Sequence, residues 1–281
     1  MTYSFESPKV FDKLLLAKDD KLREAIVISN PLGEDFSIMR TSSLNGLLTS
    51  LSTNYNRRNK NVRLYELGNI YIPKELPLKE LPDEREQFTL GMYGDGDFYS
   101  MKGVVCEFLR KTGMTENVEF DPKSSKNYLH PGRQADIVYE NQVIGYLGEL
   151  HPSCATNYSI KDRVYVAVID LILVEKFSCF EKKFQGIINF PAATRDISMV
   201  VPKQILAGQI EEVFNKKGGA YLERYELFDI YEGAQVLSGH KSMAYSLVFR
   251  AADKNLSEED ITSAMNRILK ALEALHIQLR K

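Results

Sequence analysis

The sequence predicts an α+β protein of two domains, in which helices pack on mainly antiparallel sheets. Short runs of alternating apolar residues, typical of strands, follow one another too closely for the regular strand–helix repeats of a parallel sheet. A few longer segments instead place apolar residues every three or four positions, which is typical of helices. Roughly the last hundred residues follow their own order, β-α-β-β-α-β. A length of 281 residues suits about two domains.

The N-terminal part predicts one clear helix among weaker signals. Ser7-Pro8 is typical of a helix start, residues 25–28 read as a brief strand, and residues 30–33 read as a turn. Between residues 44 and 55, leucines recur at helical spacing along one face: Leu44, Leu47, Leu48 and Leu51. This helix must bury its apolar face against another element.

A long strand and several shorter ones follow. Residues 62–72 carry apolar side chains on both faces, so we expect this strand at the centre of a sheet. The segment 73–83 holds three prolines and is a loop, and a helix at 101–112 ends at Gly113. Further strands are expected at 88–92, 118–120, 135–139, 143–150 and 165–171.

A charged link at 181–185 marks the domain boundary, which gives domains of residues 1–185 and 186–281. In the second domain, Pro202 is expected to open the first helix and Ser257 to cap the second one. The expected strands are 197–201, 221–231, 243–249 and 276–279. This order is the ferredoxin-like pattern, which by itself is compatible with many functions.

Composition limits the classes of function. The net charge of −2 argues against a protein that holds nucleic acid through overall charge, so any RNA contact must come from a local patch or from stacking. Three widely spaced cysteines, Cys106, Cys154 and Cys179, do not suggest a disulfide framework and fit a reducing cytoplasm. No apolar run approaches the roughly 20 residues of a membrane span, and the N-terminus lacks the pattern of a signal peptide. We therefore expect a cytoplasmic protein without a membrane partner.

The motifs of the chain resemble a known family. The second domain carries FPAATRDIS at 190–198, LFDIYEG at 227–233, KSMA at 241–244, NLSEED at 255–260 and a Leu-Arg pair at 279–280. The first domain carries NPL at 30–32, MRTS at 39–42, RLYELGN at 63–69 and GYLGELHP at 145–152. Together they resemble the C-terminal part of bacterial phenylalanyl-tRNA synthetase β subunits over nearly the whole chain.

The resemblance implies a fold and a set of partners. It implies a non-catalytic module like the class II synthetase core for residues 1–185, and a ferredoxin-fold anticodon-binding domain for residues 186–281. The implied partners are the catalytic α subunit, in an α2β2 heterotetramer, and tRNA(Phe), with neither DNA nor a membrane. The assembly would use ATP and magnesium through parts that this chain lacks, and the editing module of the family would lie upstream.

Catalysis by the chain itself is not expected. Arg63 and Glu66 resemble the Arg-x-x-Glu of class II motif 2, whose arginine holds an ATP phosphate. The glycine-rich strand and second arginine of motif 3 are absent from the sequence. We therefore expect structural roles for Arg63 and Glu66 and no catalytic residue.

Metal binding is not expected either. His130-Pro131 and His151-Pro152 are typical of turns, and only His151 and Cys154 approach the spacing of zinc ligands, without a second pair. The run Gly94-Asp95-Gly96-Asp97 lacks the later ligands of a calcium loop.

Three residues are the strongest candidates for RNA contact. Asp229 and Tyr231 share one face of a strand, and Ser242 begins the next strand and could lie opposite. A carboxylate can accept hydrogen bonds from guanine, and a tyrosine can stack under a base. The resemblance implies that these residues hold the wobble guanine of the phenylalanine anticodon. The alternative is a strand-end cap beside a half-buried tyrosine.

Two further sets have open alternatives. Arg195, Lys241 and Arg250 are candidate phosphate contacts or ordinary surface charges. The family implies packing against the α subunit, so Leu44, Leu47, Leu48 and Leu51 form either that interface or the domain's own core. For the whole chain, the alternatives are a purely structural assembly module and a free-standing enzyme with a degenerate ATP site.

Overall fold

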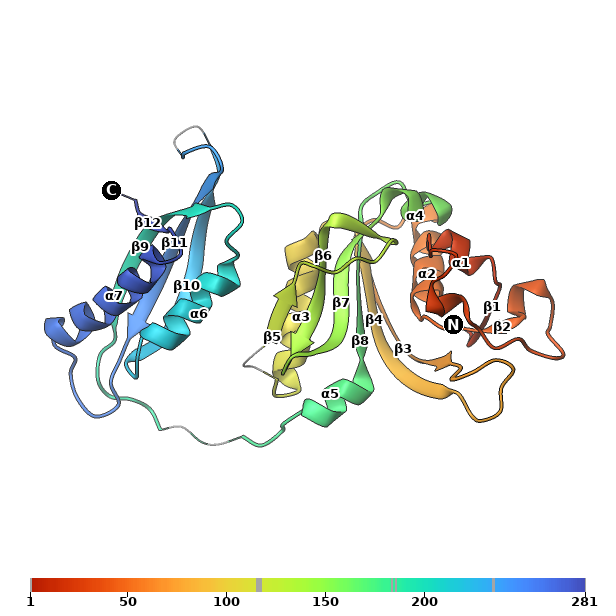
Figure 1. The fold of residues 1–281 in the computed structure, drawn as a ribbon, viewed down its shortest axis with the longest axis horizontal. Helices are drawn as coiled ribbons and strands as arrows, with labels where there is room; N and C mark the ends of the chain where they lie inside the picture. The colour runs from red at the N-terminus through yellow and green to blue at the C-terminus, as the bar shows by residue number, and fades with distance from the viewer. Residues whose placement is uncertain (1, 115–117, 183, 185, 234–235, 281) are drawn as a thin grey trace. The chain divides into compact units, whose positions relative to one another are not determined.

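The computed structural model describes all residues except 1, 115–117, 183, 185, 234–235 and 281. The chain divides into two compact units, Met1–Lys182 and Lys183–Lys281, each drawn in Figure 1. The boundary expected at residue 185 falls on a residue outside the described ones. No helix among the described residues is long and apolar enough to cross a membrane.

The first unit is built on a six-stranded sheet in which every neighbouring pair is antiparallel. Its strands, in spatial order, are β3 (Val62–Ile72), β4 (Asp83–Tyr93), β8 (Val164–Asp170), β7 (Gln142–Leu150), β6 (Leu129–Tyr139) and β5 (Val118–Asp121). Strands distant in sequence thus become neighbours, as β4 and β8 do. This confirms the predicted α+β class.

Strand β3 lies at the edge of the sheet, so its predicted central position is wrong. The apolar residues on its two faces have different surroundings. Leu64 packs against the core, whereas Tyr65 and Leu67 on the other face are 69% and 55% exposed. Apolar side chains on both faces therefore reflect an uncovered surface here rather than burial from both sides.

The N-terminal segment is less regular than expected. Helix α1 covers only Val10–Lys13. Residues 25–28 do not form a strand, because Val27 makes a single bridge to Ile38. Ile38 belongs to β2 (Ile38–Met39), which pairs with β1 (Phe5–Glu6). A strand of two residues leaves too short a pattern for sequence reasoning to detect.

Helices cover both faces of the first sheet (Figure 1). Helix α2 (Leu44–Asn56), as predicted, and α4 (Pro152–Asn157) share one core with α1. Helix α3 (Phe98–Lys111) and α5 (Leu171–Phe177) contribute to a second core on the other face. Helix α3 begins three residues earlier than expected, because Asp97 Oδ1 accepts a hydrogen bond of 2.7 Å from the Ser100 backbone N–H.

The second unit is a ferredoxin-like four-stranded antiparallel sheet with the order β10-β11-β9-β12. Its elements are β9 (Ala193–Pro202), α6 (Ala207–Lys217), β10 (Leu222–Tyr231), β11 (His240–Phe249), α7 (Glu258–Glu273) and β12 (Gln278–Leu279). Pro202 does not open the helix, because it ends β9 opposite His240. Helix α6 begins at Ala207, where the Gln209 side chain accepts a hydrogen bond from the Leu206 backbone N–H.

Candidate functional site: one face of the second sheet

Helices α6 and α7 both pack on the same face of the second sheet (Figure 1). Strand β11 turns Met243, Tyr245 and Leu247 into that core. Because side chains alternate along a strand, Ser242, Ala244 and Ser246 face the opposite side. We call this helix-free side the open face. One of the two inner strands, β11, carries these three small side chains there, and Ser242 and Ala244 are buried.

Two of the three predicted RNA contacts lie at one end of the open face. Tyr231 pairs directly with Ser242, and Asp229 pairs with Ala244. Paired residues point to the same face, so the aromatic ring and the carboxylate lie beside the small side chains of β11. Asp229 is exposed and Tyr231 is 39% exposed. A bulge between Leu227 and Asp229 keeps the open-face position of Asp229 despite the inward-facing Leu227.

Ser242 joins this group but is only 2% exposed. Its hydroxyl oxygen accepts a hydrogen bond of 3.4 Å from Arg280 Nη1. The backbone N–H of Arg280 in turn donates to the Ser198 carbonyl at 2.8 Å, which fixes the end of β12 beside β9. A cation therefore lies next to the predicted anticodon-binding residues.

The Tyr231 ring lies against the backbone of Gly233. A Cβ atom built on Gly233 would lie 2.3 Å from the Tyr231 hydroxyl oxygen and 2.5 Å from Cζ. The phenol thus folds over Gly233, where any side chain would collide with it. The absence of a side chain at position 233 leaves the space that the ring occupies.

The three predicted phosphate contacts do not join this group. Arg195 pairs with the inward-facing Leu247 and donates two hydrogen bonds of 2.7 Å to Glu258 at the start of α7. Arg250 follows the far end of β11, roughly 25 Å along the strand from Ser242, and its Nε lies 3.2 Å from Glu223 Oε2.

Lys241 also lies off the open face, since it precedes Ser242 in the alternation of β11. Burial lowers the pKa of Lys241, and the nearby Glu232 carboxylate opposes that shift. Glu232 itself forms an ion pair of 2.6 Å with Lys203. Arg195 and Lys241 thus lie off the open face, and Arg250 lies far along the strand from Ser242.

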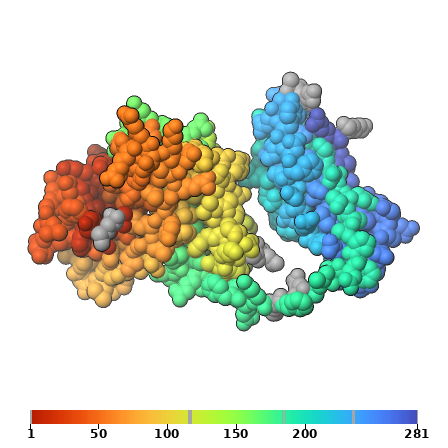
Figure 2. Space-filling model, turned by 180° about the vertical axis from the view of Figure 1, so that it is seen from behind, coloured from red at the N-terminus to blue at the C-terminus, as the bar shows by residue number. Residues whose placement is uncertain are grey.

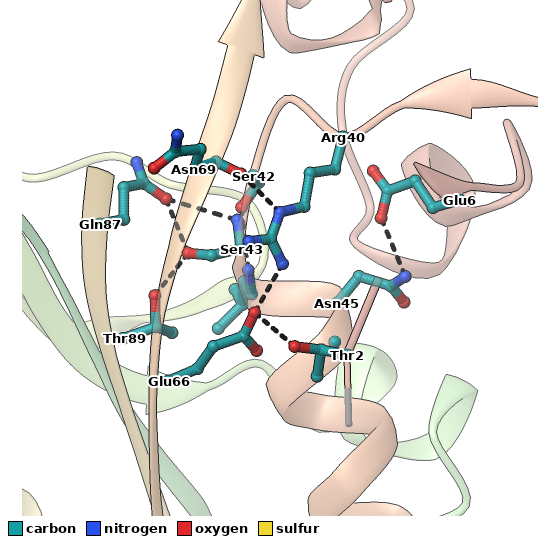
Figure 3. A network of polar contacts seen from close by, with 12 residues as sticks. Thr2, Glu6, Arg40, Ser42, Ser43, Asn45, Glu66, Asn69, Gln87 and Thr89 are labelled. Atoms are coloured by element: carbon teal, nitrogen blue, oxygen red, sulfur yellow. Dashed lines mark hydrogen bonds and ion pairs between the residues drawn. The ribbon is translucent and has the colours of Figure 1, made fainter. Parts of the chain in front are cut away.

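The first unit holds a buried polar network (Figure 3). Arg40 Nη1 donates to Glu66 Oε1 at 2.6 Å, and both side chains are less than a tenth exposed. Arg40 Nε also donates to the Asn69 carbonyl, and Thr2 donates to Glu66. Gly68 lies under this pair, since a Cβ there would be 2.1 Å from Arg40 Nη2.

A second carboxylate lies in the same region. Glu6 is 7% exposed and accepts a hydrogen bond of 2.9 Å from Asn45 Nδ2, and Asn45 Oδ1 accepts one from the Tyr158 hydroxyl. Burial raises the pKa of Glu6 to about 7, against the opposing effects of Asn45 and of the Arg40 charge.

Comparison with known proteins identifies the family. Residues 1–171 match the model described as the phenylalanyl tRNA synthetase beta chain CLM domain, and residues 189–280 match the ferredoxin-fold anticodon binding domain. The chain belongs to the phenylalanyl-tRNA synthetase β-chain family.

Curated relatives have the same family name. The phenylalanine–tRNA ligase β subunit of Clostridium acetobutylicum is 42% identical over 273 residues, which are 97% of this chain and 34% of the relative. Those of Clostridium tetani and Bacillus subtilis are 39% and 35% identical. The chain thus spans about a third of the length of the relatives it matches.

A solved structure shows a similar fold. Pyrrolysyl-tRNA synthetase from Desulfitobacterium hafniense matches with a TM-score of 0.51 and 15% identity, over 63% of each chain. At this level of identity the similarity concerns the fold alone.

The motif 2-like residues of this β-chain family member have different surroundings. Arg63 and Glu66 lie on opposite faces of β3, because they are three residues apart in a strand. Arg63 is exposed and forms an ion pair of 3.2 Å with Asp95, while Glu66 is buried against Arg40. Both residues thus take part in ion pairs within the chain.

The four leucines of α2 fill the core of their own unit. Leu44, Leu48 and Leu51 are 0% exposed and Leu47 is 2% exposed. Leu47 and Leu51 pack onto Gly91 of β4, where a Cβ would lie 2.8 Å from each. In the folded unit, the four leucines therefore form part of the core of their own domain.

The histidines predicted in turns have local roles. His130 Nδ1 accepts a hydrogen bond from the Gly132 backbone N–H, and His151 Nδ1 accepts one from Ser153. The described residues contain no group of three or more His, Cys, Asp or Glu side chains suited to a metal ion.

Arg280 is the functional candidate that sequence reasoning did not select. The Leu-Arg pair was part of the family resemblance, but the contact with Ser242 depends on β12 pairing with β9. The sequence feature that could have indicated this contact is the ferredoxin-like order, in which the last strand lies next to the first one.

Proposed function

We propose that this chain is a segment of a phenylalanine–tRNA ligase β subunit that binds the anticodon of tRNA(Phe) on the open face of its second unit. The first unit acts as a non-catalytic support for the catalytic α subunit in an α2β2 assembly in the cytoplasm. ATP and magnesium act in the α subunit. The observation that carries the proposal is the grouping of Asp229, Tyr231 and Ser242 on a helix-free sheet face.

The chemistry of this group suits a single-stranded guanine. Tyr231 offers a ring for stacking, and the exposed Asp229 carboxylate accepts the two N–H donors of a guanine Watson–Crick edge. Arg280 supplies a cation for the adjacent phosphate. Because Arg280 donates to the Ser242 hydroxyl, this hydroxyl reaches a base only when the guanidinium moves aside.

The support for α binding comes from the edge of the first sheet. Tyr65 and Leu67 project from β3 and are more than half exposed, and Tyr65 makes an edge-to-face contact with Phe88 at 5.8 Å. Exposed apolar side chains on an edge strand are suited to a protein partner. The leucines of α2 are not available for this role while the unit is folded.

The test is binding of the chain to a stem-loop RNA that carries the phenylalanine anticodon. Tyr231→Ala is expected to weaken binding by about 1–3 kcal/mol, the usual value of a lost base stack. Asp229→Ala is expected to reduce the preference for guanine over adenine at the wobble position. Tyr99→Ala and Glu259→Ala, which remove an exposed tyrosine of α3 and an exposed carboxylate of α7, serve as matched controls.

Two results would overturn the proposal. Binding that ignores the anticodon sequence would leave only attraction between charges. Equal losses for Tyr231→Ala and Tyr99→Ala would show that the ring on the open face has no special part in recognition.

A further inference from the structure

Exposed cations collect at one end of the first sheet. We call this surface the basic edge; its residues are Arg57, Arg58, Lys60, Arg133, Lys161 and Arg163. Arg133 is half-buried and the other five are exposed. The six come from three segments that are far apart in sequence: the turn between α2 and β3, strand β6, and the approach to β8.

The register of the sheet brings these segments to the same end. Val62 pairs with Tyr93, and Tyr93 pairs with Val164, so the starts of β3 and β8 flank the end of β4. Leu129 pairs with Leu150 in the next two strands. From β3 to β6 the edge spans about 20 Å at the usual strand spacing. Figure 2 shows the orange and green segments that contain these turns together at the top of the first unit.

Hydrogen bonds hold the turn between α2 and β3 in place. The Tyr93 hydroxyl donates to the Asn59 carbonyl at 2.9 Å, and the Asn59 backbone N–H donates to the Asn54 carbonyl. The Tyr55 hydroxyl donates to Asp162 at 3.3 Å, which ties the end of α2 to the segment before β8. The cations thus stand on a fixed backbone.

Carboxylates offset only part of the charge at this edge. The sequence has no Asp or Glu from residue 36 to residue 65. The buried Glu149 lies 3.1 Å from Arg133 and 3.8 Å from Arg163, so two guanidinium groups share one carboxylate. The first unit as a whole is acidic: residues 1–182 hold 23 Lys and Arg against 26 Asp and Glu, a net charge of −3. The basic edge is therefore a local reversal of sign.

We infer that the basic edge binds the phosphate backbone of RNA and gives the chain a second RNA contact outside the anticodon site. The inference rests on the proposed function to the extent that the RNA is a tRNA. The four arginines of the basic edge carry planar forks that match phosphate oxygens. Exposed Asn59 and Asn61 lie in the same turn, next to Asn56 at the end of α2, and add neutral hydrogen-bonding groups. A fixed row of cations about 20 Å long can contact several phosphates at once.

The experiment measures binding of the chain to whole tRNA(Phe) and to its anticodon stem-loop over a range of salt concentrations. One variant combines Arg57→Gln, Lys60→Gln and Lys161→Gln, which removes three exposed charges that form no ion pair among the described residues. A matched control combines Lys18→Gln, Lys21→Gln and Lys123→Gln, three exposed lysines elsewhere in the same unit. Both variants change the net charge equally.

The basic-edge variant is expected to weaken binding of whole tRNA at least about 10-fold at low salt, and to reduce the slope of log K against log salt by about 2 to 3. Stem-loop binding should stay unchanged, as should all binding by the control variant.

Equal losses in the two variants would overturn the inference and leave a solvated charged face. Unchanged tRNA binding with weakened α-subunit binding would overturn it in favour of an acidic protein partner. If Tyr231→Ala had no effect while the basic-edge loss remained, the anticodon proposal would fail alone.

Discussion

At the residue scale, the buried ion pair of Arg40 and Glu66 should matter far more for stability than the exposed pair of Arg63 and Asp95. Arg40→Ala leaves the Glu66 carboxylate buried without its cation, and is expected to lower the free energy of unfolding by about 3–5 kcal/mol. Arg63→Ala removes a charge from a pair exposed to water, so a change of about 0–1 kcal/mol is expected. Urea denaturation of both variants measures the difference, and similar losses would contradict this account.

Glu6 should make the stability of the first unit depend on pH. Burial raises the pKa of its carboxyl from 4.5 to about 7, so the folded state retains a proton that the unfolded state has released. Stability is therefore expected to fall as pH rises from 4.5 through 7, by about 3 kcal/mol in total. Glu6→Gln should remove this dependence and stabilise the protein at pH 8. Urea denaturation between pH 4 and pH 9 tests this, and an unchanged profile in the variant would refute it.

Gly233 offers a test of ring orientation that changes no RNA-contacting atom. In Gly233→Ala the new methyl group would occupy the space of the Tyr231 hydroxyl, so the ring must turn. Affinity for the anticodon stem-loop is expected to fall by about 1 kcal/mol or more, within the range of a lost stack. In the double variant with Tyr231→Ala, the glycine substitution should have no further effect. An additive loss in that double variant would place the cause elsewhere.

At the element scale, helix α2 distinguishes a core from an interface. Leu48 is 0% exposed, so Leu48→Ala is expected to lower the free energy of unfolding of the chain alone by about 2–5 kcal/mol. Thr53→Ala, on the exposed side of the same helix, should change it by less than about 0.5 kcal/mol. Thermal or urea unfolding without any partner measures both. If Leu48 lay in a subunit interface instead, Leu48→Ala would leave the free energy of unfolding of the isolated chain unchanged.

Elements that repeat an apolar pattern over several turns were predictable from the sequence. Elements whose place depends on pairing between segments far apart in the chain were not. The leucine spacing predicted α2, and the capping box of Ser257 and Asp260 marked the start of α7. The predicted central position of β3 was wrong. Its place at the edge depends on β8 pairing with β4 rather than with β3. The same limit explains the site: the alternation within β10 placed Asp229 and Tyr231 on one face, whereas the place of Arg280 depends on the pairing of β12 with β9.

At the scale of the whole molecule, each unit has cores drawn only from its own residues. The third core contains residues of the second unit alone, with Phe214 fully buried in it. Phe214→Ala is expected to lower the stability of that unit by about 3–5 kcal/mol. In this variant, backbone amides should exchange hydrogen faster in β9 to β12 and at an unchanged rate in β3 to β8. Leu48→Ala should instead speed exchange in β3 to β8 and leave β9 to β12 unchanged. Loss of protection in both units from either substitution would contradict independent cores.

The edge position of β3 has a consequence for the protein in solution. Among the described residues, this strand of 11 residues has a partner on one side only. Its outer backbone groups and the exposed Tyr65 and Leu67 form a template on which a second chain can add a strand. In concentrated solution, the chain alone should therefore aggregate by strand addition at β3. Leu67→Lys should reduce this aggregation, because it places a charge on the exposed edge.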